Sequence, residues 1–424
     1  MKRVVFIFLM MAIQLACYAQ TTLDDCQRAA QQNYPLIRRT GLIEKTTDIT
    51  VSNLAKKGWL PQIEAYGQGT MQSDVAALPD ALTGMMSQMG YEVKGLSKYQ
   101  YKVGLNVNQT VYDGGAIGAQ REVARAQGQI EQAQNDVNLY NVRARVNELF
   151  FSILLVDANI ELVKDRQALL LSNEEQLAKM LKGGVAMECD YNSVHAERIT
   201  ADRQITELQA TRRQLQQLLA AFTGQQVGVL QKPAALTVQK NVNRPELRLA
   251  DSQLLLADAH ERQVKAGLMP KVGAFAQGYY GYPGYDMFHD MYHRNATFNG
   301  IVGLKLSWNI SNFFTRKGDL AKVEMQRRMA ENGRETFLFN NQLEQVQQME
   351  EMEKYRQMIR TDEEIVALRA KVRQSHESKL RHGIINVNDL LTEITRENNA
   401  KTEMTTHEIQ WLKAQYDLKY TVNE

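Results

Sequence analysis

Two short stretches, one in each half of the chain, resemble each other and constrain the fold more than any other feature. The first reads MLKGGVAMECDYNSVHAE and the second reads KLRHGIINVNDLLTEIT. In each, a long charged helical pattern ends at a glycine (Gly184, Gly383), and six residues later an aspartate (Asp190, Asp389) begins a new helical pattern. The two glycines lie 199 residues apart, and so do the two aspartates. A fixed spacing of this kind is typical of a duplicated unit, here a helical hairpin.

The helical patterns that flank these stretches are very long. The first continues to about Lys182 from a start near Gly115, a span of about 100 Å at ~1.5 Å per residue. Its apolar residues from Val142 onward recur at spacings of four and three, and the spacing continues after the turn, with Arg212 in one polar slot. This spacing indicates coiled-coil packing, so we expect two antiparallel helices. A second pattern, over about 312–381 with a return to about 418, predicts the same hairpin again.

Each half also contains a pair of segments with alternating polarity, which predict four β-strands. In the second of them, Tyr101, Val103, Leu105 and Val107 alternate with Lys102, Gly104, Asn106 and Asn108. An apolar and a polar face that alternate over roughly ten residues are typical of a transmembrane β-strand. A small barrel needs about eight strands, so four strands require partner copies of the chain to close one. An interfacial aromatic girdle is expected from Tyr279, Tyr280, Tyr282, Tyr285, Phe288 and Tyr292.

The repeats also predict the domain organisation. Residues 1–19 read as an export signal with a cleavage site at Cys17-Tyr18-Ala19, and lipidation of Cys17 is the alternative. The first structural repeat is expected over 20–230, a polar linker over 231–243 and the second repeat over 244–424. After the signal, no apolar run reaches the ~18 residues that a membrane-spanning helix needs. If the mature chain crosses a membrane, it must therefore do so with strands closed into a barrel.

The sequence contains no arrangement that predicts catalysis. We find no nucleophile and base in a known spacing, no phosphate-binding loop and no clustered zinc ligands, and the net charge of +2 does not suit a nucleic-acid binder. We therefore expect no enzyme activity, no cofactor and no nucleic-acid partner. One group of side chains resembles a metal site, namely Met287, His289, Met291 and His293, with Met85, Met86 and Met89 in the preceding loop. Thioether and imidazole donors suit Cu(I).

The order of these motifs resembles the TolC-like outer membrane factors. The resemblance rests on the N-x-P helix starts at Asn33 and Asn243, the strand after Leu60-Pro61, the V-G-L strand that leads into QTVYDGG, and both hairpin tips. It implies a mainly α fold with β: long coiled-coil hairpins, and four transmembrane strands per chain. In this family three protomers form one 12-stranded barrel in the outer membrane, and their helices form a periplasmic tunnel that closes at the tips.

The resemblance also implies roles for residues near the tips. Asp389 matches an aspartate that rings the periplasmic constriction, and Glu393, one turn later, is expected to face the same way. Asp190 is the corresponding residue of the first hairpin, and capping of a helix N-terminus is the alternative role for both aspartates. The family's gate-locking tyrosine and arginine correspond to Leu380 and Ile385. The expected adaptor-docking surface consists of Gly183, Gly184, Val185, His382, Gly383 and Ile384.

Three functions are open from the sequence. The first is a passive outer membrane exit duct of a tripartite efflux or type I secretion system, a homotrimer in contact with outer membrane lipid. Its partners would be a periplasmic adaptor and an inner membrane transporter. The second is a periplasmic coiled-coil adaptor, which should carry a compact lipoyl-like β domain. The third is a trimeric surface stalk without transport.

Overall fold

A computed structural model describes residues 21–236 and 242–423. The expected signal segment 1–19 and residues 237–241 of the expected linker lie outside the described residues. In chain order the elements are α2 (Leu23–Asn33), α3 (Leu36–Trp59), β1 (Gln62–Met71), α4 (Asp80–Gln88), β2 (Tyr99–Tyr112), α5 (Ala116–Lys182), α6 (Glu188–Thr223), α7 (Pro245–Ala266), β3 (Lys271–Tyr282), α8 (Met287–Tyr292), β4 (Thr297–Ser307), α9 (Asn312–Arg381) and α10 (Val387–Val422).

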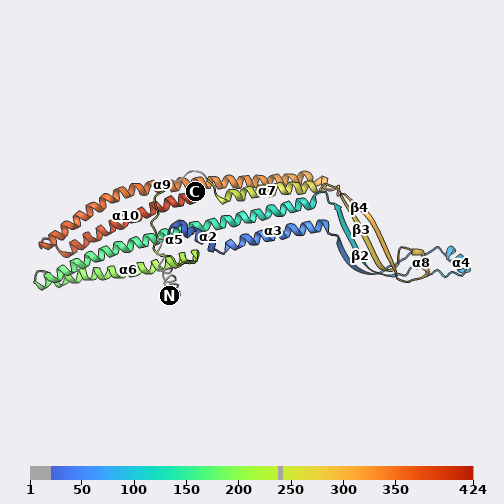
Figure 1. Cartoon of the computed structure of the whole chain (residues 1–424), viewed down its shortest axis with the longest axis horizontal. Coiled ribbons are helices and arrows are strands. Elements are labelled where there is room, and N and C mark those ends of the chain that lie inside the picture. The colour runs from blue at the N-terminus through green and yellow to red at the C-terminus, as the bar shows by residue number, and fades with distance from the viewer. Residues whose placement is uncertain (1–20, 237–241, 424) are drawn as a thin grey trace, which may run out of the picture. The chain divides into compact units, whose positions relative to one another are not determined.

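The predicted element order is confirmed. The two long helices α5 and α9 contain 67 and 70 residues, and each is followed by a shorter return helix, α6 and α10 (Figure 1). The short helices α4 and α8, one inside each strand-connecting segment, were not predicted. None of the helices in the described part of the chain is both long enough and apolar enough to cross a membrane.

The described residues pack as two compact units. The first falls within Met1–Gly41, Gln132–Leu249 and Asn332–Glu424, and the second within Leu42–Glu131 and Ala250–Glu331. Each unit therefore draws on both halves of the sequence. The expected repeats follow one another in the sequence, whereas each compact unit combines segments from both of them.

One apolar core of the first unit lies where α2 packs against the long helices. Cys26 and Ala30 of α2 meet Phe150 of α5, Leu219 of α6 and Tyr416 of α10 in one apolar cluster, and all five are buried. Four of the predicted coiled-coil positions of α5 are buried and two, Leu149 and Val156, are half-buried; the four are Val146, Ile153, Ile160 and Val163. Burying a side chain of this size contributes about 1.5–3 kcal/mol, so the heptad positions supply much of the packing energy.

The polar slot in the predicted coiled coil is matched by a partner. Arg212 of α6 forms an ion pair with Asp157 of α5, with Nε and Oδ1 2.5 Å apart. A charge on an otherwise apolar seam must be paired to avoid a large desolvation cost. This pair joins α5 and α6 across the seam, with both side chains only partly exposed.

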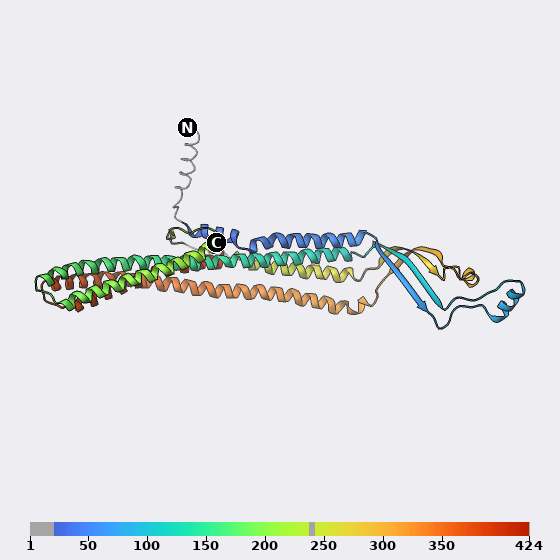
Figure 2. The same ribbon diagram turned by 90° about the horizontal axis from the view of Figure 1, so that it is seen from below.

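A second core lies near the hairpin tips. Leu170 and Leu177 of α5, Val194 of α6, and Leu390 and Ile394 of α10 are buried together. The two hairpins thus pack on each other, and both tips lie at the same end of this bundle (Figures 1 and 2).

The second unit contains a four-stranded antiparallel sheet in the order β1-β2-β3-β4. The register places Ile63, Val107, Ala276 and Val302 in one row across the sheet, and Glu64, Asn106, Gln277 and Ile301 in the next. Because successive side chains alternate between faces, one face is apolar and the other is mainly polar, as predicted. The apolar face is uncovered within the chain: the exposed fractions of Val302, Leu304 and Leu306 are 79%, 78% and 71%.

Two residues of the expected aromatic girdle are buried instead. Tyr279 and Tyr282 are 3% and 2% exposed. The Tyr282 hydroxyl accepts a hydrogen bond from the backbone N–H of Ser97 at 2.9 Å and donates to the carbonyl of Asp290 at 3.2 Å. Through these contacts Tyr282 is bonded to both strand-connecting segments. Because Tyr279 and Tyr282 are buried, the girdle prediction was wrong for these two tyrosines.

Candidate functional site: the hairpin tips

The two tips have the same backbone geometry. Gly184 and Gly383 adopt φ values of +69° and +70°, a left-handed conformation that glycine accepts without strain. The N–H of Val185 donates to the carbonyl of Met180, and the N–H of Ile384 donates to the carbonyl of Lys379, each at 2.9 Å. Together with the bonds from the glycine N–H groups, this is the Schellman pattern that ends a helix. The equal spacing of the two glycines in the sequence thus corresponds to two equivalent turns.

Both predicted gate aspartates lie in capping positions. The Asp389 carboxylate accepts a hydrogen bond from the N–H of Asn386 at 3.3 Å, while the Asn386 side chain accepts from the N–H of Asp389 at 2.9 Å. Asp190 accepts from the N–H of Met187 at 3.4 Å. These contacts satisfy N–H groups at the start of α10 and α6, as the capping alternative expects. Asp389 is exposed and Asp190 half-buried, so capping leaves both carboxylates partly in contact with solvent.

Glu393 lies in different surroundings from Asp389. Its side chain is only 8% exposed, and its carboxylate meets Arg396 at 2.5 Å and Arg369 at 3.6 Å. The structure therefore surrounds Glu393 with two guanidinium groups from α9 and α10. Leu380, at the position of the family's lock tyrosine, packs against the apolar core beside the tips.

The predicted docking residues present apolar side chains to solvent. Val185 and Ile384, at corresponding positions of the two tips, are 74% and 70% exposed, and Met187 is 70% exposed. A Cβ added at Gly184 or Gly383 would meet no atom within 4 Å, so both turns are open on their outer side. These side chains are therefore available for contact with another molecule.

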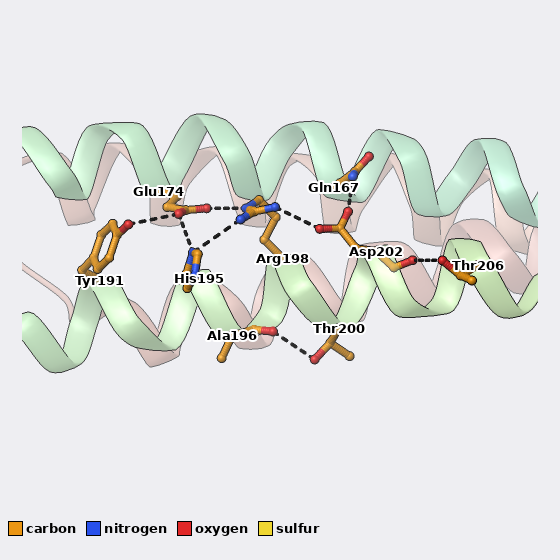
Figure 3. Close-up of polar contacts among 9 residues, drawn as sticks. All are labelled: Gln167, Glu174, Tyr191, His195, Ala196, Arg198, Thr200, Asp202 and Thr206. Atoms are coloured by element: carbon orange, nitrogen blue, oxygen red, sulfur yellow. Dashed lines mark hydrogen bonds and ion pairs between the residues drawn. The ribbon is translucent and has the colours of Figure 1, made fainter.

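Behind the first tip, α5 and α6 are joined by a charged network (Figure 3). Glu174 of α5 accepts a hydrogen bond from Arg198 Nε at 2.6 Å, and its other oxygen lies 2.6 Å from His195 Nδ1. Arg198 also pairs with Asp202 at 2.9 Å, and Gln167 donates to the Asp202 carboxylate. The side chains of Glu174 and Arg198 are 10% and 23% exposed, whereas His195 and Asp202 are 39% and 40% exposed, so the link is poorly solvated at its centre and open to solvent at its ends.

Behind the second tip, the same three positions carry the opposite charges. The residues 199 positions after Glu174, Arg198 and Asp202 are Arg373, Glu397 and Lys401. Arg373 of α9 donates to Glu397 of α10, and Lys401 lies 2.8 Å from the same carboxylate. The geometry of the link is thus duplicated with its charges exchanged. Sequence reasoning missed this relationship, although applying the 199-residue spacing to Glu174 reveals it.

Both carboxylates of these links are held in the ionised form. Burial raises the pKa of Glu174, but hydrogen bonds from Arg198 and His195 outweigh it and lower the pKa below its usual value. Burial likewise raises the pKa of Glu397, and hydrogen bonds from Lys401 and Arg373 outweigh it, so this pKa is also lowered. Each of the two links therefore contains a glutamate that is little exposed and paired with a positive charge.

The predicted metal-site residues are only partly brought together. His289 of α8 and His293, which follows this helix, have ring centroids 4.8 Å apart, and Met86 of the other loop lines the same cavity. Met291 is instead buried against Leu96 and Tyr282. Within residues 21–236 and 242–423 there is no group of three or more His, Cys, Asp or Glu that suits a metal ion.

Comparison with known proteins places the fold. No protein-family model and no curated protein matches the sequence. The outer membrane protein VceC from Vibrio cholerae matches in structure with a TM-score of 0.67 at 15% identity, covering 94% of this chain and 95% of that one. CusC matches with a TM-score of 0.68 at 12% identity, covering 95% and 92%. The Campylobacter jejuni outer membrane channel CmeC matches with a TM-score of 0.64 at 12% identity, covering 94% and 85%.

These matches extend over almost the whole chain, from the strands to both hairpins. At such low identity they concern the fold. The resemblance to the TolC-like outer membrane factors is thereby confirmed: this chain has their fold.

Proposed function

We propose that this protein is a passive outer membrane exit duct of a tripartite efflux or type I secretion system. It lies in the outer membrane and extends into the periplasm. It performs no chemistry, and an inner membrane transporter joined through a periplasmic adaptor supplies the energy. The observation that carries the proposal is the four-stranded sheet, which has an uncovered apolar face and a mainly polar opposite face.

The sheet supports a trimer. Its outer strands β1 and β4 have no strand partner beyond β2 and β3 in the described chain, so each leaves a row of backbone N–H and C=O groups unpaired. Three copies joined edge to edge give a 12-stranded barrel with the apolar face toward lipid and the polar face toward the lumen. In this arrangement the backbone groups of every edge strand are paired with a strand of a neighbouring copy, which a single four-stranded sheet cannot achieve.

Bilayer recording tests the proposal directly. Purified protein in detergent should be trimeric and should give stable conductance steps in a planar bilayer. Val302→Arg places a charge on the apolar face, and should prevent insertion because a charge facing lipid costs about 2–4 kcal/mol per copy near the bilayer midplane. Asn106→Arg, on the polar face, is the matched control and should still insert. A monodisperse monomer, or equal insertion of both variants, would contradict the proposal.

The tips support docking of the adaptor. Val185 and Ile384 are exposed apolar side chains on turns that have open space around them. Val185→Glu and Ile384→Glu should reduce export without lowering the trimer yield, because neither side chain packs in a core. Loss of trimer in parallel with export would show that these residues serve folding instead.

The remaining alternatives make different predictions. A periplasmic adaptor should fractionate away from the outer membrane, and its β domain should be compact rather than a single open sheet. A surface stalk without transport should fractionate with the outer membrane but give no conductance. Conductance together with outer membrane fractionation therefore separates the duct from both.

A further inference from the structure

A cavity lies between the two segments that connect the strands. It has a volume of about 590 Å³. Its lining comes from α4 and the chain after it, and from α8 and its C-cap residue: Met86, Gly90, Tyr91, Glu92, Lys94, His289, Tyr292 and His293. Nothing in the exit-duct function requires a cavity of this composition at this end of the sheet.

The two histidines are placed as a pair. His289 lies in α8 and His293 is the residue that caps the C-terminus of this helix, and their ring centroids are 4.8 Å apart. The Asp286 side chain accepts a hydrogen bond from the backbone N–H of His289 at 3.0 Å, which fixes the start of α8. Among the described residues, neither imidazole has a hydrogen-bond partner for its ring nitrogens. Both rings are exposed to the cavity with free lone pairs.

A thioether is held at the same cavity from the other segment. Met86 of α4 is half-buried, and its sulfur accepts a hydrogen bond from the Tyr292 hydroxyl at 3.4 Å. Tyr91 packs edge-on against the Tyr292 ring, with centroids 6.4 Å apart. Tyr292 lines the same cavity as the two histidines, so this bond holds the Met86 sulfur at the cavity that they line.

The donor set selects a soft metal. The cavity lining includes one carboxylate, that of Glu92, which is 80% exposed and lies 3.5 Å from Lys94, so a hard cation would find a single carboxylate ligand there. Two imidazoles and one thioether match the preferences of Cu(I), whereas Ca²⁺ and Mg²⁺ require oxygen ligands. We propose that His289, His293 and Met86 form a binding site for a soft monovalent cation of the Cu(I) type.

Such a site would link the two strand-connecting segments. Met86 belongs to the segment between β1 and β2, and the two histidines belong to the segment between β3 and β4. A bound ion would replace the weak Tyr292–Met86 contact with coordinate bonds between them. Binding would therefore stiffen this end of the second unit and shield Met86 from oxidation.

Silver(I) is a practical probe, since it has the same charge and ligand preference and does not oxidise in air. The exposed thiol of Cys189 would also bind Ag(I), so the experiment uses the full chain with Cys189→Ser. Calorimetric titration of this protein in detergent should show one Ag(I) per chain. Met86→Leu should weaken binding at least tenfold, and His289→Asn with His293→Asn should abolish it.

Met287→Leu is the matched control, because Met287 lies on the same helix, is 52% exposed and does not line the cavity. It should bind as the parent does. The proposal is overturned if Met287→Leu loses as much affinity as Met86→Leu, or if no stoichiometric binding occurs. It is also overturned if Zn²⁺ binds as tightly as Ag(I) and Met86→Leu has no effect, which would indicate a two-histidine site for a divalent ion. Unchanged trimer migration on a gel verifies that each variant is folded.

Discussion

Glu174 and Arg373 occupy equivalent positions on the two hairpins and carry opposite charges, and each is joined to the return helix by a residue of the other sign. Glu174 meets Arg198, and Arg373 meets Glu397. Because the charges are exchanged between the two links, each long helix has a charge complementary to its own return helix and not to that of the other hairpin. If α5 paired with α10 in this register, Glu174 would face Glu397, and if α9 paired with α6, Arg373 would face Arg198. Like charges in a poorly solvated seam are strongly unfavourable, so the exchange disfavours both wrong pairings.

The first prediction concerns reversal of one link. Glu174→Arg should lower the thermal stability of the folded protein, because it places two guanidinium groups together in a site that is mostly closed to solvent. Adding Arg198→Glu should recover part of the loss, since the reversed pair then has the orientation of Arg373 and Glu397, while Asp202 remains where the second hairpin has Lys401. Thermal unfolding of the two single variants and the double variant gives the coupling energy between the residues.

A matched control for this cycle lies on the same helix. Glu161 and Lys164 form an ion pair at 2.8 Å, but their side chains are 71% and 48% exposed. Exposed pairs contribute little, so Glu161→Lys should change stability by less than about 0.5 kcal/mol. Equal losses at Glu161 and Glu174, or no recovery in the double variant, would show that the link does not specify the pairing.

The hairpins and strands could be predicted from the sequence because their periodicities are long and regular. The burial of Val146 and Ile153 and the alternation around Val103 follow directly from spacing. The short helices α4 and α8 could not be predicted in this way, because six to nine residues contain too few turns for a clear period.

The candidate site was predicted less fully than the fold. The turns at Gly184 and Gly383 were located correctly, because glycine marks a left-handed helix end. Met86 and His293 line one cavity because two segments distant in sequence meet there, and a local sequence pattern contains no information about such a meeting. The burial of Tyr279 and Tyr282 was missed for the same reason, since their partners lie across the sheet or in the other segment.

The second prediction concerns acid. The pKa values of Glu174 and Glu397 are lowered in the folded protein, so both residues contribute stability that is complete above the usual glutamate pKa of about 4.3 and is lost as the pH falls through the lowered values. The glutamate lies on α5 in the first link and on α10 in the second, but each link contains one that becomes protonated in acid. Both hairpins should therefore lose stability in the same range, below about pH 4. Hydrogen exchange of α6 and α10 against pH measures this. Glu397→Gln should remove much of the acid dependence in α10 alone.

The third prediction concerns the two described cysteines. Cys26 is 1% exposed, and burial together with the nearby charge of Asp25 raises the pKa of its thiol to about 11. Because the thiolate is the reactive form, a maleimide should modify Cys189, which is exposed near the first tip, and should leave Cys26 intact until the protein is unfolded. Mass spectrometry of labelled peptides distinguishes the two sites. Rapid labelling of Cys26 in the folded protein would contradict the packing of α2.

The fourth prediction concerns the turns. Gly184→Ala should cost about 1 kcal/mol, and the cost should come from the left-handed backbone alone, because an added Cβ has no neighbour within 4 Å. Gly333 in α9 is the control, since its Cβ would also meet nothing but its backbone is helical. Gly333→Ala should stabilise the protein by about 0.5–1 kcal/mol. Denaturant unfolding of the two variants should therefore give shifts of opposite sign.

The last prediction concerns the proposed gate. In a threefold assembly, three copies of Asp389 would lie at one level of the tunnel, and such a ring should favour cations over anions. Asp389→Asn keeps a side-chain oxygen that can accept the hydrogen bond from Asn386, so it should change stability by less than about 1 kcal/mol while it lowers cation preference and weakens block by divalent cations from the periplasmic side.

Asp190→Asn provides the comparison for the gate, because Asp190 has the same capping role at the first tip. Glu393 is expected to add little to the electrostatic field in the tunnel, since its charge is already balanced by Arg369 and Arg396. Glu393→Gln should therefore leave ion selectivity nearly unchanged. Single-channel recording of the three variants separates the roles. A larger effect of Asp389→Asn than of Asp190→Asn assigns the constriction to the second tip, whereas equal small effects would mean that both aspartates act only as helix caps.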